Sequence, residues 1–254
     1  MTKYTIGVLG IGEVGKAISQ IFSSQFKVLK KDSNFDQLKN TKIDVLHVCI
    51  PYTNSFINSV ISQVEKNRPN LIIIHATVIP TTTQKIYQKT QIPTVHSPIM
   101  GKHPNLRRDI MRFVKFIGPT SPKSLKLAKV HLSSVGIKTI ALHDSIESEL
   151  GKLLDSTYYA WNIIFNKVVA EICSRQKVDF NNVYTKFNKI YNLGYAKTNP
   201  FVLRPILKYV KGTIGGHCII PNTKLLNQFM PTILTEVILK INKSQEQNTV
   251  KGKA

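Results

Sequence analysis

The pattern of apolar and polar positions divides the chain into two halves with different periods. In residues 1–142, short apolar runs alternate with segments whose apolar residues recur every three or four positions. The runs predict strands at 4–9, 27–29, 44–50, 71–75, 94–96, 113–117 and 138–142. The segments predict helices at 14–22, 56–64, 83–88 and 124–135. This alternation predicts an α/β fold, a doubly wound parallel sheet of the Rossmann type.

The second half has a helical period throughout. Apolar residues follow a 3.6-residue repeat from 145 to 175, and further helices are predicted at 183–191 and 223–229. No comparable strand pattern occurs after residue 142, and the last ten residues are expected to be frayed. We therefore expect an all-helical domain at 143–254 after an α/β domain at 1–142. One small domain cannot cover so long a helix, so we expect a homodimer formed through 145–175.

The charge of the chain is strongly positive, with 35 Lys and Arg against 14 Asp and Glu. Such an excess suits a solvated surface, a site for an anionic small molecule, or nucleic-acid binding. Nucleic acid is the least expected partner, because no RNP, zinc-finger or paired-aromatic pattern is present. The densest basic cluster comprises Lys102, Arg107, Arg108, Arg112 and Lys115.

The three cysteines, Cys49, Cys173 and Cys218, are scattered and form no Cys-x-x-Cys motif. They predict neither a disulfide framework nor a metal site. No apolar run approaches the roughly 18 residues of a membrane-spanning helix. We therefore expect a cytoplasmic protein with no metal and no membrane association.

A glycine motif, GIGEVG, follows the first predicted strand and opens the first predicted helix. In a dinucleotide-binding turn the first glycine makes the turn, the second admits the pyrophosphate and the third lets helix and strand pack closely. An acidic residue about 20 positions later is expected to bind the ribose hydroxyls, and Asp32 stands there. Lys30 and Lys31 favour the alternative of NADP over NAD, and a glycine turn that binds nothing is a third interpretation. The candidate cofactor residues here are Gly10, Ile11, Gly12, Glu13, Val14, Gly15 and Asp32.

A second motif, GGHCIIPNTKLL, occupies residues 215–226. Paired glycines allow a ligand to approach the backbone closely. A cysteine just ahead of a helix can be stabilised as a thiolate by the helix dipole, and His217 would act in the same direction. The alternative interpretation is a buried cysteine in a glycine turn.

These motifs, with several between them, resemble the UDP-glucose/GDP-mannose dehydrogenase family of NAD-dependent nucleotide-sugar dehydrogenases. After the glycine motif the matching segments are IPYT at 50–53, HATVIPTT at 75–82, SPI at 97–99, KLLDS at 152–156, FNK at 165–167 and GGHCIIPNTK at 215–224. Their order is complete and covers nearly the whole chain. The resemblance implies a short form without the family's third, nucleotide-holding domain.

The resemblance also implies roles for individual residues. Cys218 matches the nucleophile that captures an aldehyde as a thiohemiacetal and then a thioester. Lys152 matches the lysine that stabilises an oxyanion, and Thr77 the hydroxyl near the nicotinamide. Asn222 stands at a catalytic aspartate position, and Pro51 joins the cofactor residues. The candidate substrate-binding residues are His96, Lys102, His103, Arg204, Gly216 and His217.

Several positions depart from the family pattern. Ile99 and His103 replace two glutamates, Ser156 replaces the asparagine that partners the lysine, and Asn222 replaces the aspartate. The sequence therefore predicts an NAD-dependent dehydrogenase that acts on an alcohol of an anionic, sugar- or nucleotide-linked substrate. A two-electron reaction is as compatible with these residues as a four-electron one. A catalytically degenerate NAD-binding or scaffold protein is the alternative, and we expect His47, His75, His131 and His143 to be packing residues.

Overall fold

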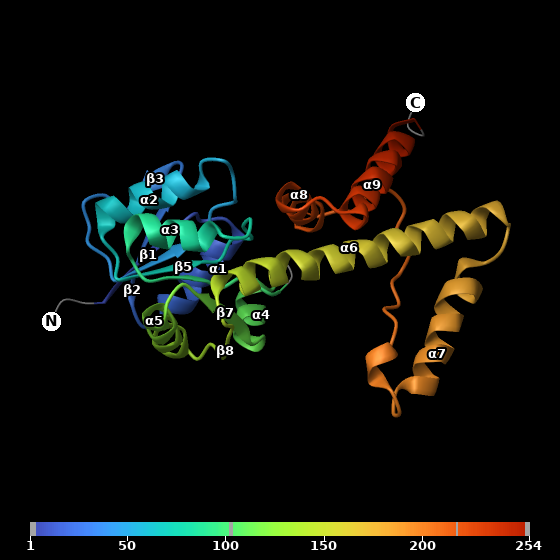
Figure 1. The fold of residues 1–254 in the computed structure, drawn as a ribbon, viewed down its shortest axis with the longest axis horizontal. Helices are drawn as coiled ribbons and strands as arrows, with labels where there is room; N and C mark the ends of the chain where they lie inside the picture. Colours follow the sequence, from blue (N-terminus) through green and yellow to red (C-terminus); the bar gives the residue numbers. More distant parts are fainter. Residues whose placement is uncertain (1–3, 102–103, 217, 252–254) are drawn as a thin grey trace. The chain divides into compact units, whose positions relative to one another are not determined.

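The computed structural model describes residues 4–101, 104–216 and 218–251. The chain divides into two compact units, Met1–Lys152 and Leu153–Ala254 (Figure 1). The first unit contains the sheet and the second is helical. The predicted boundary after residue 142 remains a prediction, since the division falls within a helix that begins in the first unit.

The first unit is built on one eight-stranded sheet with the order β3-β2-β1-β4-β5-β6-β7-β8. Strands β2, β1, β4, β5 and β6 are parallel, as the sequence predicted. The strands are β1 (Thr5–Leu9), β2 (Lys27–Asp32), β3 (Phe35–Asp36), β4 (Val45–Val48), β5 (Leu71–Ile74), β6 (Thr94–His96), β7 (Lys115–Pro119) and β8 (Thr139–Ala141).

The sheet is not wholly parallel, which corrects the prediction at two places. The two-residue strand β3 folds back antiparallel on β2, and β7 runs antiparallel to β6. The described part of the chain between β6 and β7 holds one short helix, and β7 begins at the edge of the sheet where β6 ends. Strand β8 is parallel to β7.

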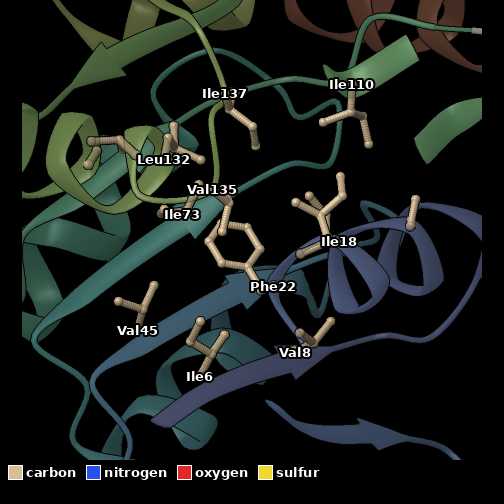
Figure 2. Packing of buried hydrophobic residues seen from close by; sticks show 14 of the residues in the cluster. Ile6, Val8, Ile18, Phe22, Val45, Ile73, Ile110, Leu132, Val135 and Ile137 are labelled. Atoms are coloured by element: carbon tan, nitrogen blue, oxygen red, sulfur yellow. The ribbon is translucent and has the colours of Figure 1, made fainter. Parts of the chain in front are cut away.

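Helices cover both faces of this sheet. They are α1 (Glu13–Phe22), α2 (Phe56–Asn67), α3 (Thr82–Thr90), α4 (Leu106–Arg112) and α5 (Pro122–Ser133). Successive strand residues point to opposite faces, so Ile73 packs in one core cluster while Ile72 and Ile74 pack in the other. Figure 2 shows the first cluster, in which Phe22 and Ile18 of α1 face the strands. Both faces of the sheet are therefore covered from solvent, as the near-continuous apolar strands require.

The second unit consists of helices joined by irregular segments. The long helix α6 (Ser145–Arg175) has the bounds that the sequence predicted and contributes its residues from Leu153 onward to this unit. It is followed by the π-helix η1 (Asn181–Lys186), α7 (Phe187–Tyr195), the short 3-10 helix η2 (Pro200–Val202), α8 (Ile219–Phe229) and α9 (Ile233–Lys251). The buried apolar cluster here is small and comprises Ala160, Ile164, Ile214 and Ile238.

The sequence missed β3, α4 and α9. Helix α9 reaches Lys251, where we predicted a frayed end. None of the helices in the described part of the chain is long and apolar enough to span a membrane.

Candidate functional site

The loop between β1 and α1 has the geometry of a dinucleotide-binding turn. Gly10 has φ +90°, and a Cβ there would lie 2.8 Å from the backbone nitrogen of Ile50. A Cβ on Gly15 would lie 1.9 Å from the carbonyl oxygen of Gly10. Side chains at these two positions are excluded by backbone, so both glycines are needed for the turn itself.

Gly12 differs from its two neighbours in the motif. A Cβ there would meet nothing within 4 Å. Gly12 is also the N-cap of α1. It has no side chain that could accept hydrogen bonds from the N–H groups of the first helical turn, which have no partner within the helix. The glycine therefore leaves open space at a helix N-terminus, where amides and the helix dipole favour an anion. Glu13 is exposed and Val14 is half-buried on the same turn.

Asp32 ends β2 beside this loop and is tied to it. Its Oδ2 accepts a hydrogen bond from the backbone N–H of Ile11 at 2.5 Å, and its Oδ1 accepts from the backbone N–H of Ser33 at 2.7 Å. These two donors hold the pKa of Asp32 below its usual value. The ionised, half-exposed carboxylate keeps unused lone pairs, which suits it to ribose hydroxyls.

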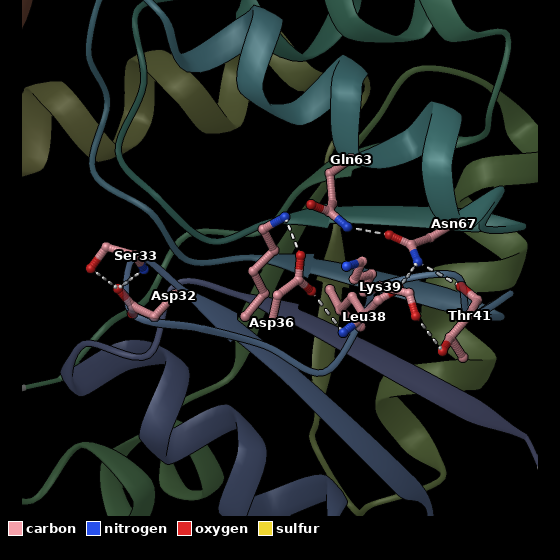
Figure 3. A network of polar contacts seen from close by, with 9 residues as sticks. Asp32, Ser33, Asp36, Leu38, Lys39, Thr41, Gln63 and Asn67 are labelled. Atoms are coloured by element: carbon pink, nitrogen blue, oxygen red, sulfur yellow. Dashed lines mark hydrogen bonds and ion pairs between the residues drawn. The ribbon is translucent and has the colours of Figure 1, made fainter.

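One of the two lysines that favoured NADP is already paired. Lys31 Nζ lies 2.6 Å from Asp36 Oδ2, and this pair and Asp32 are drawn in Figure 3. The backbone N–H of Leu38 donates to the other oxygen of Asp36. Asp36 therefore draws the Lys31 ammonium toward β3.

The other predicted cofactor residues follow the ends of parallel strands. Pro51 comes shortly after β4 and is exposed, while Thr77 lies three residues beyond β5 and is half-buried. Residues at the carboxyl ends of neighbouring parallel strands meet at one edge of a doubly wound sheet, where such folds bind ligands.

The segment that carries Thr77 is held by buried polar side chains. His96, fully buried, contacts the carbonyl oxygen of Ala76 through Nε2 at 3.1 Å and the Ser148 hydroxyl through Nδ1 at 2.8 Å. Glu149 of α6 accepts hydrogen bonds from the backbone N–H groups of Thr81 and Thr83 at 2.7 and 2.8 Å. Burial raises the pKa of Glu149 to about 7 despite these donors. Both ring nitrogens of His96 are engaged within the protein, so its expected contact with substrate gains no support.

The structure describes only some of the other residues for which the sequence predicted a functional role in the first unit. Lys102 and His103 lie outside the described residues. Lys115, the last member of the densest basic cluster, is buried at 4% exposure and therefore adds nothing to a solvated basic surface. Lys152 is half-buried on α6, one turn after Ser148 and Glu149.

In the second unit, the structure brings together Asn222 and Ser156, two of the four positions that depart from the family pattern. Asn222 Nδ2 donates to Ser156 Oγ at 3.0 Å, and both residues are buried. Cys218 is exposed at the N-cap of α8, and its carbonyl oxygen accepts from the Asn222 N–H at 2.9 Å. Gly216 has φ +87° and open space around it, and His217 lies outside the described residues.

The irregular segment that precedes Cys218 is fixed by side chains from helices. Lys167 of α6, 5% exposed, donates to the carbonyl oxygens of Val210 and Gly212. The backbone of Arg204 exchanges two hydrogen bonds with the Asn192 side chain, both 2.9 Å, and its guanidinium stacks 3.5 Å above the Tyr191 ring. The sequence analysis assigned Lys167 no role, because the carbonyl oxygens that it bonds lie more than 40 positions later in the chain.

Sequence reasoning also treated three buried histidines as separate packing residues. His131 Nε2 lies 2.8 Å from His47 Nε2, and His47 Nδ1 lies 2.8 Å from His75 Nε2. His75 Nδ1 in turn contacts the carbonyl oxygen of Ser97 at 3.0 Å. Burial lowers the pKa of all three, that of His131 to about 4. Their wide spacing in sequence gives no sign of this contact, whereas His143 has an exposed side chain.

The mostly parallel sheet and its glycine loop define a Rossmann-type dinucleotide-binding fold. No protein-family model matches the chain. Among curated proteins it is 27% identical to the UDP-N-acetyl-D-mannosamine dehydrogenase of Methanocaldococcus jannaschii, over 93% of this chain and 63% of that protein. It is 26% identical to the enzyme of the same name from Methanococcus vannielii, over 84% of this chain and 53% of that protein. These relatives confirm the resemblance to nucleotide-sugar dehydrogenases.

Solved structures agree on the fold. The UDP-D-ManNAc dehydrogenase of Pyrococcus horikoshii superposes with a TM-score of 0.74 at 19% identity, covering 95% of this chain and 68% of that one. The 3-hydroxyisobutyrate dehydrogenase of Mycobacterium tuberculosis has a TM-score of 0.73 at 12% identity, covering 96% and 94%. The chain thus spans just over half to two thirds of the nucleotide-sugar dehydrogenases that it matches.

Proposed function

We propose that the chain is an NAD-dependent dehydrogenase that oxidises a hydroxyl group of a nucleotide sugar. The observation that carries the proposal is the Gly10–Gly15 loop, in which two glycines are sterically required and Gly12 leaves open space beside the Asp32 carboxylate. The curated relatives, all named as UDP-N-acetyl-D-mannosamine dehydrogenases, supply the substrate class.

NAD is favoured over NADP by the charges near Asp32. A 2′-phosphate would need a free cation, and Lys31 is paired with Asp36 at 2.6 Å. The ionised Asp32 would repel a phosphate but accept hydrogen bonds from two ribose hydroxyls. Bound NAD would supply the hydride acceptor.

The chemical steps can be assigned to residues that the resemblance singled out. We assign to Thr77 the orientation of the nicotinamide and to the Lys152 ammonium the stabilisation of negative charge on the reacting oxygen. We assign to the Cys218 thiolate addition to the aldehyde carbon, which forms a C–S bond while the carbonyl oxygen takes up a proton. Cys218 is exposed at the start of α8 and is therefore accessible for this addition.

The pair Asn222 and Ser156 bears on how far the oxidation proceeds. Neither side chain can act as a carboxylate base, and each is engaged with the other in a buried hydrogen bond. Activation of water for thioester hydrolysis therefore has to come from another group. We propose that oxidation to the aldehyde is the faster step and that release of the acid is slow.

The same proposal includes two partners. The first is the anionic substrate, for which Arg204, Gly216 and His217 remain candidate ligands. The second is another copy of the chain, docked on α6, where several large apolar side chains are exposed. Between 37% and 58% of the side-chain surface is exposed at Ile146, Leu154, Tyr158, Tyr159, Trp161, Phe165 and Ile172.

The test is turnover by the purified chain with NAD and UDP-N-acetyl-D-mannosamine, followed by NADH absorbance and by chromatography of the sugar products. We expect Lys152→Ala to lose at least 100-fold in kcat and Cys218→Ala to lose acid formation. Lys129→Ala, at an exposed position of α5, is the matched control. A fully active Lys152→Ala variant would refute the assignment.

A further inference from the structure

Lys115 is a buried cation whose described hydrogen bonds go to two backbone carbonyls. It lies in β7 with 4% of its surface exposed. Its Nζ donates to the carbonyl oxygens of Ser97, at 2.5 Å, and Pro98, at 2.8 Å. A buried ammonium is costly unless its hydrogens are bonded, and these two carbonyls accept two of its three hydrogens.

The two carbonyls belong to the first residues after β6. The Ser97 carbonyl also accepts from His75 Nδ1 at 3.0 Å, and the Ser97 hydroxyl donates to the carbonyl of Phe116 at 2.7 Å. The carbonyls of the 97–98 turn are thus bonded by the side chains of Lys115 and His75, and the turn's own Ser97 hydroxyl bonds the backbone of β7. It is the start of the segment that leads from β6 to α4.

The histidine chain determines which hydrogens point at this turn. The Ser97 oxygen can only accept, so His75 Nδ1 carries a hydrogen and, in the neutral ring, Nε2 accepts. His47 Nδ1 must then donate to His75, which leaves His47 Nε2 to accept from His131 Nε2. The hydrogen bonds therefore all run in one direction and end on the Ser97 oxygen.

The electrostatics agree with this arrangement. Burial lowers the pKa of Lys115 to about 7, and it also lowers the pKa values of His47, His75, His96 and His131. The nearby Cys49 thiol has its pKa raised to about 12 by burial and so stays neutral. The charge of Lys152 lowers the pKa of Lys115 in the same direction as burial does. A neutral Lys115 amine would still carry two hydrogens and bond both carbonyls.

We propose that Lys115 is a positioning residue that fixes the 97–98 turn, and through it the edge of the sheet at the carboxyl end of β6, where the nucleotide sugar of the proposed function would approach Thr77. The part about the nucleotide sugar rests on the proposed function, whereas the fixing of the turn does not. Lys115 itself contacts no substrate in this proposal. Its removal should leave NAD binding intact, because the cofactor loop at 10–15 follows β1 and not β6.

The test compares Lys115→Met, which keeps the length of the side chain but no donors, with Lys115→Arg, which keeps the donors. Lys129→Met, on the exposed side of α5, is the matched control. Hydrogen–deuterium exchange of the 97–101 segment should accelerate about tenfold in Lys115→Met, remain near wild type in Lys129→Met, and be largely restored in Lys115→Arg. NADH affinity within twofold of wild type shows that the unit is folded.

In turnover assays Lys115→Met should raise KM for the nucleotide sugar at least tenfold with a change in kcat below threefold. Unchanged exchange at 97–101 in Lys115→Met would overturn the proposal, as would a loss confined to kcat. If the wild-type chain oxidises no nucleotide sugar, the proposed function fails by itself. The exchange experiment then still decides whether Lys115 fixes the turn.

Discussion

The two units of the chain bury their side chains to very different degrees. The first unit packs apolar residues on both faces of its sheet. It also buries Lys115 and three histidines, which are hydrogen-bonded to one another or to backbone carbonyls. The second unit buries four apolar residues in its cluster and exposes many large ones along α6 and α7. The first unit is thus built to fold around its own core, whereas the second has apolar surface that suits a partner.

The largest expected effect separates folding from binding within the glycine loop. Gly15→Ala places a Cβ against the backbone of Gly10 and should cost about 3 kcal/mol or more in unfolding free energy. Gly12→Ala has open space around its Cβ and should change stability by less than about 1 kcal/mol. Urea unfolding measures both. Equal losses in the two variants would show that the loop is only a packing feature.

The next effect uses pH to probe the polar core of the first unit. The folded-state pKa of His131 is lowered to about 4, so its contribution to stability is present above the unfolded value near 6.5 and is lost as pH falls toward 4. This one residue should account for about 3 kcal/mol of acid destabilisation.

His47 and His75 should add to this loss, because their pKa values are also lowered. His131→Gln should flatten the dependence of unfolding free energy on pH between 6.5 and 4. His143→Gln, at an exposed position, should not flatten it. A wild-type protein equally stable at both pH values would contradict the neutral histidine chain.

The exposed surface of α6 provides a smaller effect, confined to the second unit. Phe165, 51% exposed, should contribute to the proposed homodimer, and Phe165→Glu should raise the dimer dissociation constant at least tenfold. Sedimentation velocity over a range of concentrations measures this constant. Asp155→Lys, a charge change at an exposed position of the same helix, is the control. A wild-type chain that stays monomeric at all concentrations would refute the dimer.

The smallest effect concerns one helix cap in the first unit. The Ser121 hydroxyl accepts from the Ser124 N–H, and the Ser124 hydroxyl is bonded to the Ser121 backbone in return, a capping box at the start of α5. Ser121→Ala should cost about 1 kcal/mol. Ser133→Ala, in the last turn of the same helix, should cost less, since its hydroxyl only bonds the carbonyl of Val130. Thermal unfolding of the two variants distinguishes these expectations.

Much of the first unit could be predicted because its signals are local. The alternation of apolar runs and helical segments gave five parallel strands, and the 3.6-residue repeat gave α6 with its bounds. The GIGEVG motif and Asp32 were recognised by spacing alone, and the structure places the Asp32 carboxylate 2.5 Å from the Ile11 nitrogen. The strand β7 was predicted at 113–117, but its antiparallel direction was missed, because strand direction depends on where the connection leads.

The buried polar contacts could not be predicted, since they join residues far apart in the sequence. Lys115 belongs by composition to a basic cluster, and only the position of β7 in the sheet turns its side chain inward. His47 and His131 are separated by 84 positions, and they meet because α5 packs on the face of the sheet to which the His47 side chain of β4 points. The hydrogen bond between Asn222 and Ser156 likewise depends on how α8 packs against α6.

The most direct test of the central claim, that the first unit binds NAD through the 10–15 loop and Asp32, is a fluorescence titration of the chain with NADH. We expect saturable one-to-one binding, weakened at least tenfold by Gly12→Val and by Asp32→Ala, with no change in Gly151→Ala. NADPH should bind more weakly than NADH. An absence of NADH binding by the folded wild-type chain, or binding that Gly12→Val and Asp32→Ala leave unchanged, would contradict the account.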